Sequence, residues 1–391
     1  AITRLSTNLP AAYNYKELGE TWSAPRIFRL PNSGAGDNQI EDDIYVAVMG
    51  GGYGGRDDKV GSALFVINLE DSATPGKVEK VIEVEDYNSI NIVNSVPGTP
   101  VVVTPDLARG IKFKGALVYV NDFEGKISKF NLTNMSDDGQ GNSIKLYDST
   151  VLLSIDANKK NGRYQFHAMD AGVGQTTKQL WLFSGTGDYE RLTSKDSNIE
   201  NLMYGFRDKA YPLFKQTRNE LSVLYGLKPC IDTTGDTQGY KCPVTTKEYD
   251  RISRKKKDNG WYIKLKNSQK VTAEPTVSNG LVYFPLFEPS QSANKCSLGL
   301  ALICAVNDEC GTNVSDQLGS LKDQKIDGKT YAGKTCYAVG QGVLSRLVVF
   351  AKKLFANIAG KSVQNKTDLV VIDSGMADLD TFRNSWREGN F

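Results

Sequence analysis

Histidine is almost absent from this 391-residue chain, which argues against a zinc site built on histidine ligands. His167 is the one histidine, and the six cysteines contain no C-x-x-C pair, so a structural zinc site is not expected. No apolar run reaches the roughly 18 residues that a membrane-spanning helix needs. The 47 basic residues nearly balance the 45 acidic ones, which gives no electrostatic basis for wholesale binding of nucleic acid.

Helical periodicity is also scarce, whereas short apolar runs that end in turn residues recur along the chain. Runs such as "DIYVAVM", "GALVYVND" and "GLVYFPLF" are rich in Val, Tyr, Phe and Leu, as β-strands are. The best helical candidates are "DYERLTSKDSNIENLMYGF" (188–206) and "KQTRNELSVLYGL" (215–227), which we interpret as short helical insertions. The sequence therefore predicts an all-β protein.

The predicted strands form a weak repeat. Four segments are typical of the first strand of a unit: "SAPRIFRLPN" (23–32), "GTPVVVTPD" (98–106), "TAEPTVSNG" (272–280) and "QGVLSRLVV" (341–349). Each precedes a second apolar strand, and a third strand ending in Asn or Asp often follows, as in "SALFVINLED" and "KISKFNLTN". Such units, repeated at intervals of tens of residues, indicate the blades of a β-propeller. A pair of β-sandwich domains, the competing interpretation, would give less similar units.

A glycine cluster in "IYVAVMGGGYGG" (44–55) matches G-x-G-x-x-G formally through Gly50, Gly52 and Gly55. In a dinucleotide-binding turn the third glycine opens a helix whose amides face the pyrophosphate. Here the next apolar run predicts another strand, so we expect no bound nucleotide. We interpret these glycines as points where backbones approach closely and turn with positive φ.

The cysteines cluster toward the C-terminal end, which indicates disulfides formed in an oxidising compartment. One bridge is expected between Cys230 and Cys242, which bracket a polar loop, and three pairings of the other four stay open. Six free thiols in a cytosolic protein are the alternative. The cysteines are Cys230, Cys242, Cys296, Cys304, Cys310 and Cys336.

The order of several motifs resembles the C-terminal domain of the PilC/PilY family of type IV pilus proteins. The motifs include "ELGETWSAPRIFRL", "VAVMGGGYGG", "GALVYVNDFEGKISKFNL", "LWLFSGTGDYE" and "RNSWRE", within a span from Leu18 to Glu388. The resemblance implies a modified quinoprotein-like β-propeller of about seven blades. We expect one domain over 1–391, with insertions near 188–260 and 288–340, that forms the C-terminal part of a longer protein.

The resemblance also implies a non-enzymatic protein at the cell surface, the pilus tip or the outer membrane of a Gram-negative bacterium. Such a protein promotes pilus assembly, opposes retraction and supports adhesion and twitching motility, so the expected partners are pilins, the pilus machinery and a host-cell receptor. The alternatives are a periplasmic quinoprotein-like enzyme and a propeller scaffold for outer-membrane assembly.

Enzyme chemistry has little support in the sequence. Quinoprotein dehydrogenases resemble one another in an adjacent cysteine pair, which this chain lacks, so we expect no pyrroloquinoline quinone; blade architecture alone does not transfer activity. A Ser-His-Asp triad through His167 and Asp170 would lack a G-x-S-x-G elbow. We interpret His167 as a hydrogen-bonded residue at a strand end.

Calcium is the metal that the resemblance implies, in a loop of alternating Asp and Asn before the strand "GALVYVND". That position reads "DLARGIKFK" (106–114) and keeps only Asp106, so the site is lost, which argues against calcium-controlled retraction. Two other loops alternate oxygen ligands as calcium sites do, and a solvated acidic turn is the alternative for both. The candidate ligands are Asp37, Gln39, Glu41 and Asp43 in the first loop, and Asp138, Gln140 and Asn142 in the second.

A basic run, "RISRKKKD", is the most polarised patch of the chain. It is a candidate surface for anionic glycans, membrane lipid or an acidic pilin, and a solvated loop is the alternative. Few aromatic residues interleave with it, which disfavours nucleic-acid binding. The basic residues are Arg251, Arg254, Lys255, Lys256 and Lys257.

Overall fold

Nearly all of the secondary structure is β. A computed structural model describes residues 11–31, 43–54, 60–84, 94–105, 114–155, 157–215, 227–229, 260–291, 298–312, 314, 318, 321, 325–326, 329–330, 335–362 and 369–374. Apart from short 3₁₀ turns such as η2 (Ala11–Tyr13), the described elements are strands, which confirms the predicted all-β class. Within these ranges no helix is long and apolar enough to cross a membrane.

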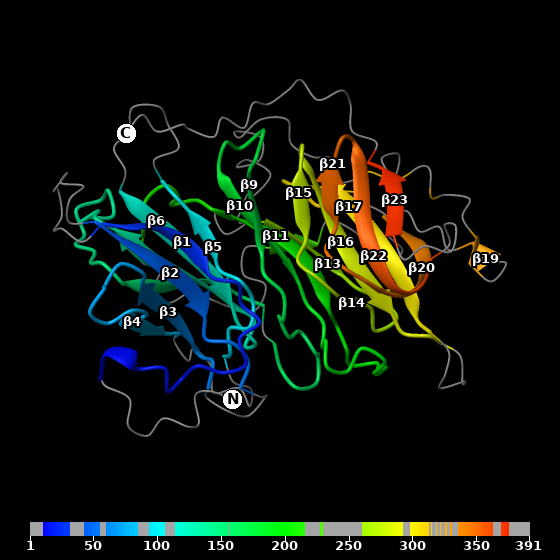
Figure 1. The fold of residues 1–391 in the computed structure, drawn as a ribbon. Helices are drawn as coiled ribbons and strands as arrows, with labels where there is room; N and C mark the ends of the chain where they lie inside the picture. Colours follow the sequence, from blue (N-terminus) through cyan, green and yellow to red (C-terminus); the bar gives the residue numbers. More distant parts are fainter. Residues whose placement is uncertain are drawn as a thin grey trace.

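Four sheets of four or more strands follow one another along the chain and lie side by side (Figure 1). The first two are antiparallel with their strands in chain order, as in a propeller blade. The first holds β1 (Arg26–Leu30), β2 (Ile44–Gly50), β3 (Ala63–Asn68) and β4 (Val78–Glu83). The second holds β5 (Val101–Val103), β6 (Gly115–Asn121), β7 (Lys126–Thr133) and β8 (Ser149–Ser154).

The third sheet runs in the order β12-β13-β11-β10-β9. Its strands are β9 (Asp170–Val173), β10 (Leu180–Gly185), β11 (Leu202–Asp208), β12 (Leu227–Pro229) and β13 (Gly260–Lys264). All of its neighbouring strands are antiparallel except β12, which runs parallel to β13 at the edge.

The fourth sheet has eight strands in two parts that share β22 (Lys353–Ser362). One half of β22 pairs with β20, and the other half pairs with β21 and β23. The remaining strands are β14 (Lys270–Val271), β15 (Thr276–Ser278), β16 (Leu281–Glu288), β17 (Leu300–Asn307), β20 (Cys336–Leu344), β21 (Val348–Phe350) and β23 (Leu369–Asp373). A separate pair is formed by β18 (Lys325–Ile326) and β19 (Lys329–Thr330).

These curled sheets confirm the propeller class and the predicted repeat. The four predicted first-strand segments contain β1, β5 and β15 and most of β21, and the strands that follow them in the chain are β2, β6, β16 and β22. The number of about seven blades and the single domain over 1–391 stay predictions.

The helix predicted over 188–206 is wrong. This stretch forms turns and then enters β11, which pairs with β10 on one side and β13 on the other. All residues of β11 are buried, and the pairing and burial of such a central strand override a local helical pattern. Because β11 lies within 188–260, part of that range belongs to a sheet. The other candidate helix, 215–227, falls almost entirely outside the described residues.

The hydrophobic core lies between neighbouring sheets because side chains alternate between the two faces of a strand. On β6, Ala116, Val118 and Val120 contact the first sheet, whereas Leu117 and Tyr119 contact the third. On β16 the same alternation joins a cluster with the third sheet and a cluster with β21, β22 and β23. The central parts of β6 and β16 are therefore apolar on both faces.

The glycine cluster is a crowding point between strands, as predicted. A Cβ atom at Gly50 would lie 2.4 Å from the carbonyl oxygen of Val96, and one at Gly52 would lie 2.3 Å from that of Glu20. Gly52 has a φ of +88°, which favours glycine. Gly55 lies outside the described residues.

Candidate functional site

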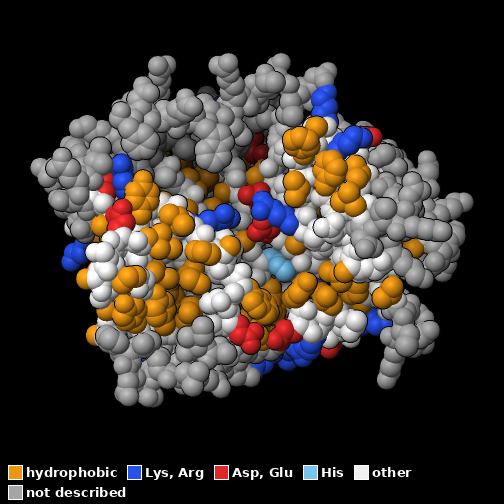
Figure 2. Space-filling view, viewed as in Figure 1, with side chains coloured by type: hydrophobic (Ala, Val, Ile, Leu, Met, Phe, Trp, Pro, Cys, Tyr) orange, Lys and Arg blue, Asp and Glu red, His pale blue; other side chains and the backbone are white. Residues whose placement is uncertain are grey.

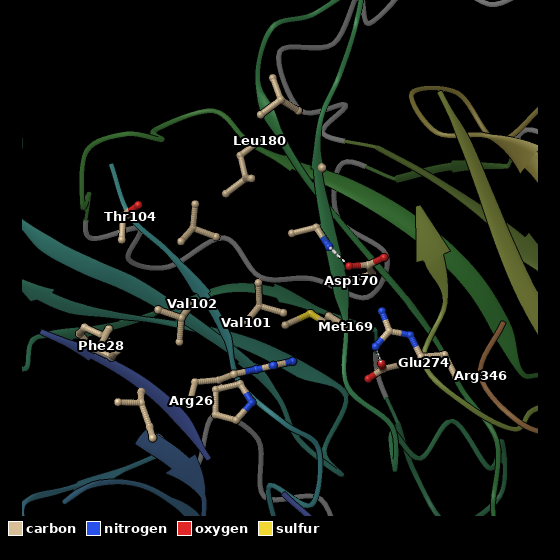
Figure 3. A pocket seen from close by; sticks show the side chains of 16 residues that line it. Arg26, Phe28, Val101, Val102, Thr104, Met169, Asp170, Leu180, Glu274 and Arg346 are labelled. Atoms are coloured by element: carbon tan, nitrogen blue, oxygen red, sulfur yellow. Dashed lines mark hydrogen bonds and ion pairs between the residues drawn. The ribbon is translucent and has the colours of Figure 1, made fainter. Parts of the chain in front are cut away.

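The first strands of three sheets and two connecting segments of the fourth sheet surround a pocket of about 660 Å³. β1, β5 and β9 supply most of its walls, while Glu274 just before β15 and Arg346 just before β21 lie at one end (Figure 3). Its walls are largely apolar, with Val101, Val102 and Met169 among them. Small-molecule and cofactor pockets in proteins occupy about 300–1,000 Å³ and combine apolar walls with a few polar groups. This pocket has the size and composition of a binding site.

Four charged side chains converge at that end of the pocket. Arg346 forms an ion pair with Glu274, and Arg26 extends from β1 toward that pair (Figure 3). Arg26 is exposed and forms no ion pair with any residue in the described part of the chain. Figure 2 shows basic and acidic side chains together at the centre of this face, with apolar side chains on either side.

Asp170 is the fourth of these side chains, and backbone amides hold its carboxylate. Its Oδ2 atom accepts a hydrogen bond from the Val277 amide at 2.8 Å, and Oδ1 accepts one from the Ala171 amide at 3.0 Å. Burial raises the pKa of Asp170, while the two amides, Arg346 and Arg26 oppose the rise. Burial likewise raises the pKa of Glu274, and the Arg346 guanidinium opposes it. The side chain of Asp170 thus links β9 to β15 through the Val277 amide, and it also lines the pocket.

His167 lies close to Asp170 in sequence but has other neighbours. Its ring meets that of Tyr189 edge-on at 5.0 Å, and its buried Nε2 atom has no hydrogen-bond partner. Burial lowers the pKa of His167 to about 4. The hydrogen bond expected of this histidine is thus missing at Nε2, and the described residues show none between His167 and Asp170.

The first candidate calcium loop is described only at Asp43, which forms an ion pair with Arg29 at 3.0 Å. Asp37, Gln39 and Glu41 lie outside the described residues. This loop stays a prediction.

The second candidate calcium loop directs its polar atoms toward one another. Asp138 accepts hydrogen bonds from the amides of Gln140 and Asn142 and, at 2.7 Å, from the side-chain amide of Asn142. The side-chain oxygen of Gln140 accepts a hydrogen bond from the Lys215 ammonium at 2.9 Å. Among the described residues, no group of three or more His, Cys, Asp or Glu is placed to hold a metal ion. Calcium binding here also stays a prediction.

Cys304 and Cys336 form a disulfide, which resolves part of the pairing that the sequence left open. The two residues lie directly opposite each other on β17 and β20, with Cα atoms 4.0 Å apart, so this bridge lies within a sheet. Cys310 is also disulfide-bonded. Cys230, Cys242 and Cys296 fall outside the described residues, as does the basic run from Arg251 to Lys257 and nearly all of the loop 106–114.

The charged cluster was not predicted from the sequence. Arg26, Glu274 and Arg346 all lie in segments that were predicted as first strands, and Asp170 was considered only as a partner of His167. The repeat was the available signal, because first strands of propeller blades gather around one axis.

Comparison with known proteins shows similarity of fold only. No protein-family model and no curated protein matches the sequence. The crystal structure of the Pseudomonas aeruginosa PilY1 C-terminal domain is similar with a TM-score of 0.55 and 15% identity, over 92% of this chain and 73% of that one. The crystal structure of BamB from Moraxella catarrhalis gives a TM-score of 0.25 and 12% identity, over 84% of this chain and 81% of that one. This chain therefore shares its fold with the PilY1 C-terminal domain.

Proposed function

We propose that this protein is a non-enzymatic binding module of a type IV pilus system, which promotes pilus assembly and opposes retraction. The observation that carries the proposal is the similarity of fold to the PilY1 C-terminal domain over 92% of this chain. The ordered motifs from Leu18 to Glu388 support the same assignment. Its partners on this proposal are pilins or the pilus machinery, and a host-cell receptor during adhesion.

The proposal places the protein outside the cytoplasm, at the cell surface or the pilus tip. The Cys304–Cys336 disulfide supports this placement, because disulfides form and persist in oxidising compartments. The pocket supports a binding role. Its acidic side chains already have partners, since backbone amides hold Asp170 and Arg346 pairs with Glu274.

Deletion of this domain in the source bacterium, with pilus number and retraction measured in the same cells, tests the proposal. We expect fewer surface pili and weaker twitching, and re-expression of the intact gene should restore both. If the domain opposes retraction, inactivating the retraction motor in the deletion strain should return the pili. Unchanged pilus number and twitching in the deletion strain would contradict the pilus role.

The enzyme alternative makes a different prediction that needs only the purified protein. A quinoprotein-like enzyme should show the visible absorbance of a redox cofactor after purification or after addition of pyrroloquinoline quinone. We expect neither, and saturable cofactor binding with turnover of an alcohol or aldehyde would replace the non-enzymatic proposal.

A further inference from the structure

One cation of the pocket, Arg26, forms no direct ion pair with the described residues, although its charge helps to oppose the rise in the pKa of Asp170 and of Glu274. The carboxylate of Asp170 is held by two backbone amides, and that of Glu274 is paired with Arg346. Arg26 remains exposed at the wall with no ion-pair partner in the described ranges. A guanidinium binds a carboxylate through two parallel hydrogen bonds, so the complementary ligand group is an acid.

The pocket wall next to Arg26 is apolar and open to solvent. Ile27 on β1 is 64% exposed and Val173 on β9 is 52% exposed, although both belong to strands that also contribute to the structure's interior. Val101, Val102 and Val103 on β5 are half-buried between them. A ligand that reaches Arg26 thus meets exposed or half-buried apolar side chains of β1, β5 and β9 next to the charged end of the pocket.

The backbone around the pocket favours an extended chain as the ligand. In the described part of the molecule, β1 pairs with β2, β5 with β6 and β9 with β10, and no strand pairs with the opposite edge of any of the three, although β15 lies close to β9. Such edges offer amide and carbonyl groups in the spacing that an added strand needs, while the side-chain pockets select alternate residues.

From these observations we propose that the pocket binds an extended peptide segment that carries one acidic side chain between apolar ones. The acidic side chain binds Arg26, and its apolar neighbours contact Ile27, Val173 and the valines of β5. This peptide site lies in the pocket and does not depend on the pilus role, so either proposal can fail without the other.

Binding of defined peptides to the purified protein tests this site. The probes are fluorescently labelled, end-blocked heptapeptides of valine and threonine with a central glutamate, glutamine or lysine. We expect the glutamate peptide to bind at least tenfold more tightly than the glutamine peptide and the lysine peptide to bind least. Added salt should weaken the glutamate peptide most, because charge pairing at an accessible site is screened.

Three variants locate the binding. Arg26→Ala should weaken the glutamate peptide at least tenfold with little effect on the glutamine peptide, and Arg26→Lys should keep part of the affinity. Val173→Asp should abolish binding, since it places a like charge on an already exposed wall position. Lys80→Ala is the matched control, because Lys80 is an exposed cation on the outermost strand of the same sheet as Arg26. Melting temperatures of all variants report whether each remains folded.

Three results would overturn the proposal. The first is equal affinity for the glutamate and glutamine peptides, and the second is the absence of binding by all three up to millimolar concentration. The third is binding of the single blocked amino acid, N-acetylglutamate amide, as tightly as the heptapeptide, which would make this a pocket for small acids.

Discussion

Buried ionisable side chains link neighbouring sheets of this protein. The Nζ atom of Lys129 on β7 lies 2.5 Å from Oδ2 of Asp208 on β11, and the Tyr119 hydroxyl donates a hydrogen bond to the same oxygen at 2.8 Å. Burial lowers the pKa of Lys129, and the Asp208 carboxylate opposes that shift. Removing one partner of such a pair leaves the other charged in apolar surroundings, which costs more than the pair contributes when intact.

Lys129→Met should therefore lower the free energy of unfolding by about 3–5 kcal/mol, because Asp208 loses its counter-ion. The double variant Lys129→Met with Asp208→Asn should be less destabilised, since the amide carries no charge and still accepts from Tyr119. Urea unfolding followed by tryptophan fluorescence measures both. A single variant that is as stable as the double variant would show that Asp208 does not depend on Lys129.

His167 should make the protein less stable as the solution becomes acidic. Burial lowers its folded-state pKa to about 4, from 6.5 as the ordinary value, so the unfolded chain takes up a proton at a pH where the folded protein does not. The contribution of neutral His167 to the free energy of unfolding is fully present above pH 6.5 and is lost as the pH falls toward 4.

The comparison that tests this uses wild type and His167→Gln, with urea midpoints measured at several values of pH between 4 and 7.5. Asp308, whose pKa burial raises to about 6, contributes the opposite slope to both proteins and cancels in the difference. Wild type should lose more stability than the variant between pH 6.5 and 4. Parallel profiles would mean that His167 titrates normally in the folded protein.

Individual strands depend on their pairing partners as much as on their own residues. Cys304 and Cys336 are joined because the register of β17 and β20 sets them opposite each other, and the bridge closes a sequence separation of 32 residues. Thr276 on β15 donates a hydrogen bond to the Leu347 carbonyl at 2.6 Å, which adds a contact between the two parts of the eight-stranded sheet. Strand pairing and cross-links together hold the C-terminal part of the molecule.

Cys304→Ala with Cys336→Ala should lower the free energy of unfolding by about 3–4 kcal/mol, because the open chain gains conformational entropy when it unfolds. Alanine is the suitable replacement, since Cys304 is fully buried and a serine hydroxyl would lack a partner there. Denaturant unfolding without reductant measures the change. Stability equal to wild type would show that the bridge adds nothing beyond the pairing of β17 with β20.

The pocket is a property of the whole molecule. Its lining comes from strands of three sheets and from Glu274 and Arg346, which lie between strands of the fourth, so the pocket persists only while the sheets keep their arrangement. Cross-links that stabilise the sheets should therefore matter more to the protein than metal ions bound at the candidate loops.

Reductant should lower the melting temperature, and a calcium chelator should leave it unchanged. Asp138 already has hydrogen-bond donors within its own loop, and Asp43 is paired with Arg29, so neither side chain lacks a partner without a metal. Differential scanning fluorimetry with and without each reagent, and with added calcium, makes the comparison. A chelator effect as large as that of the reductant would establish a structural calcium site.

Strand content, the repeat and the glycine crowding point could be predicted because they depend on local properties. Alternating or continuous apolar runs closed by turn residues specify strands, and Gly52 occupies a φ that few other residues adopt. The even number of clustered cysteines likewise indicated a disulfide, which the Cys304–Cys336 bridge confirms.

Pairing over long sequence separations was decided only by the tertiary structure. The helix predicted over 188–206 failed because β11 is a fully buried central strand, and burial outweighs local propensity. The partner of Cys304 followed from the register of β17 with β20, which no spacing reveals. Arg26, Asp170, Glu274 and Arg346 come together because the sheets bring β1, β9 and two connecting segments of the fourth sheet around one pocket, and that convergence is a property of the assembled fold.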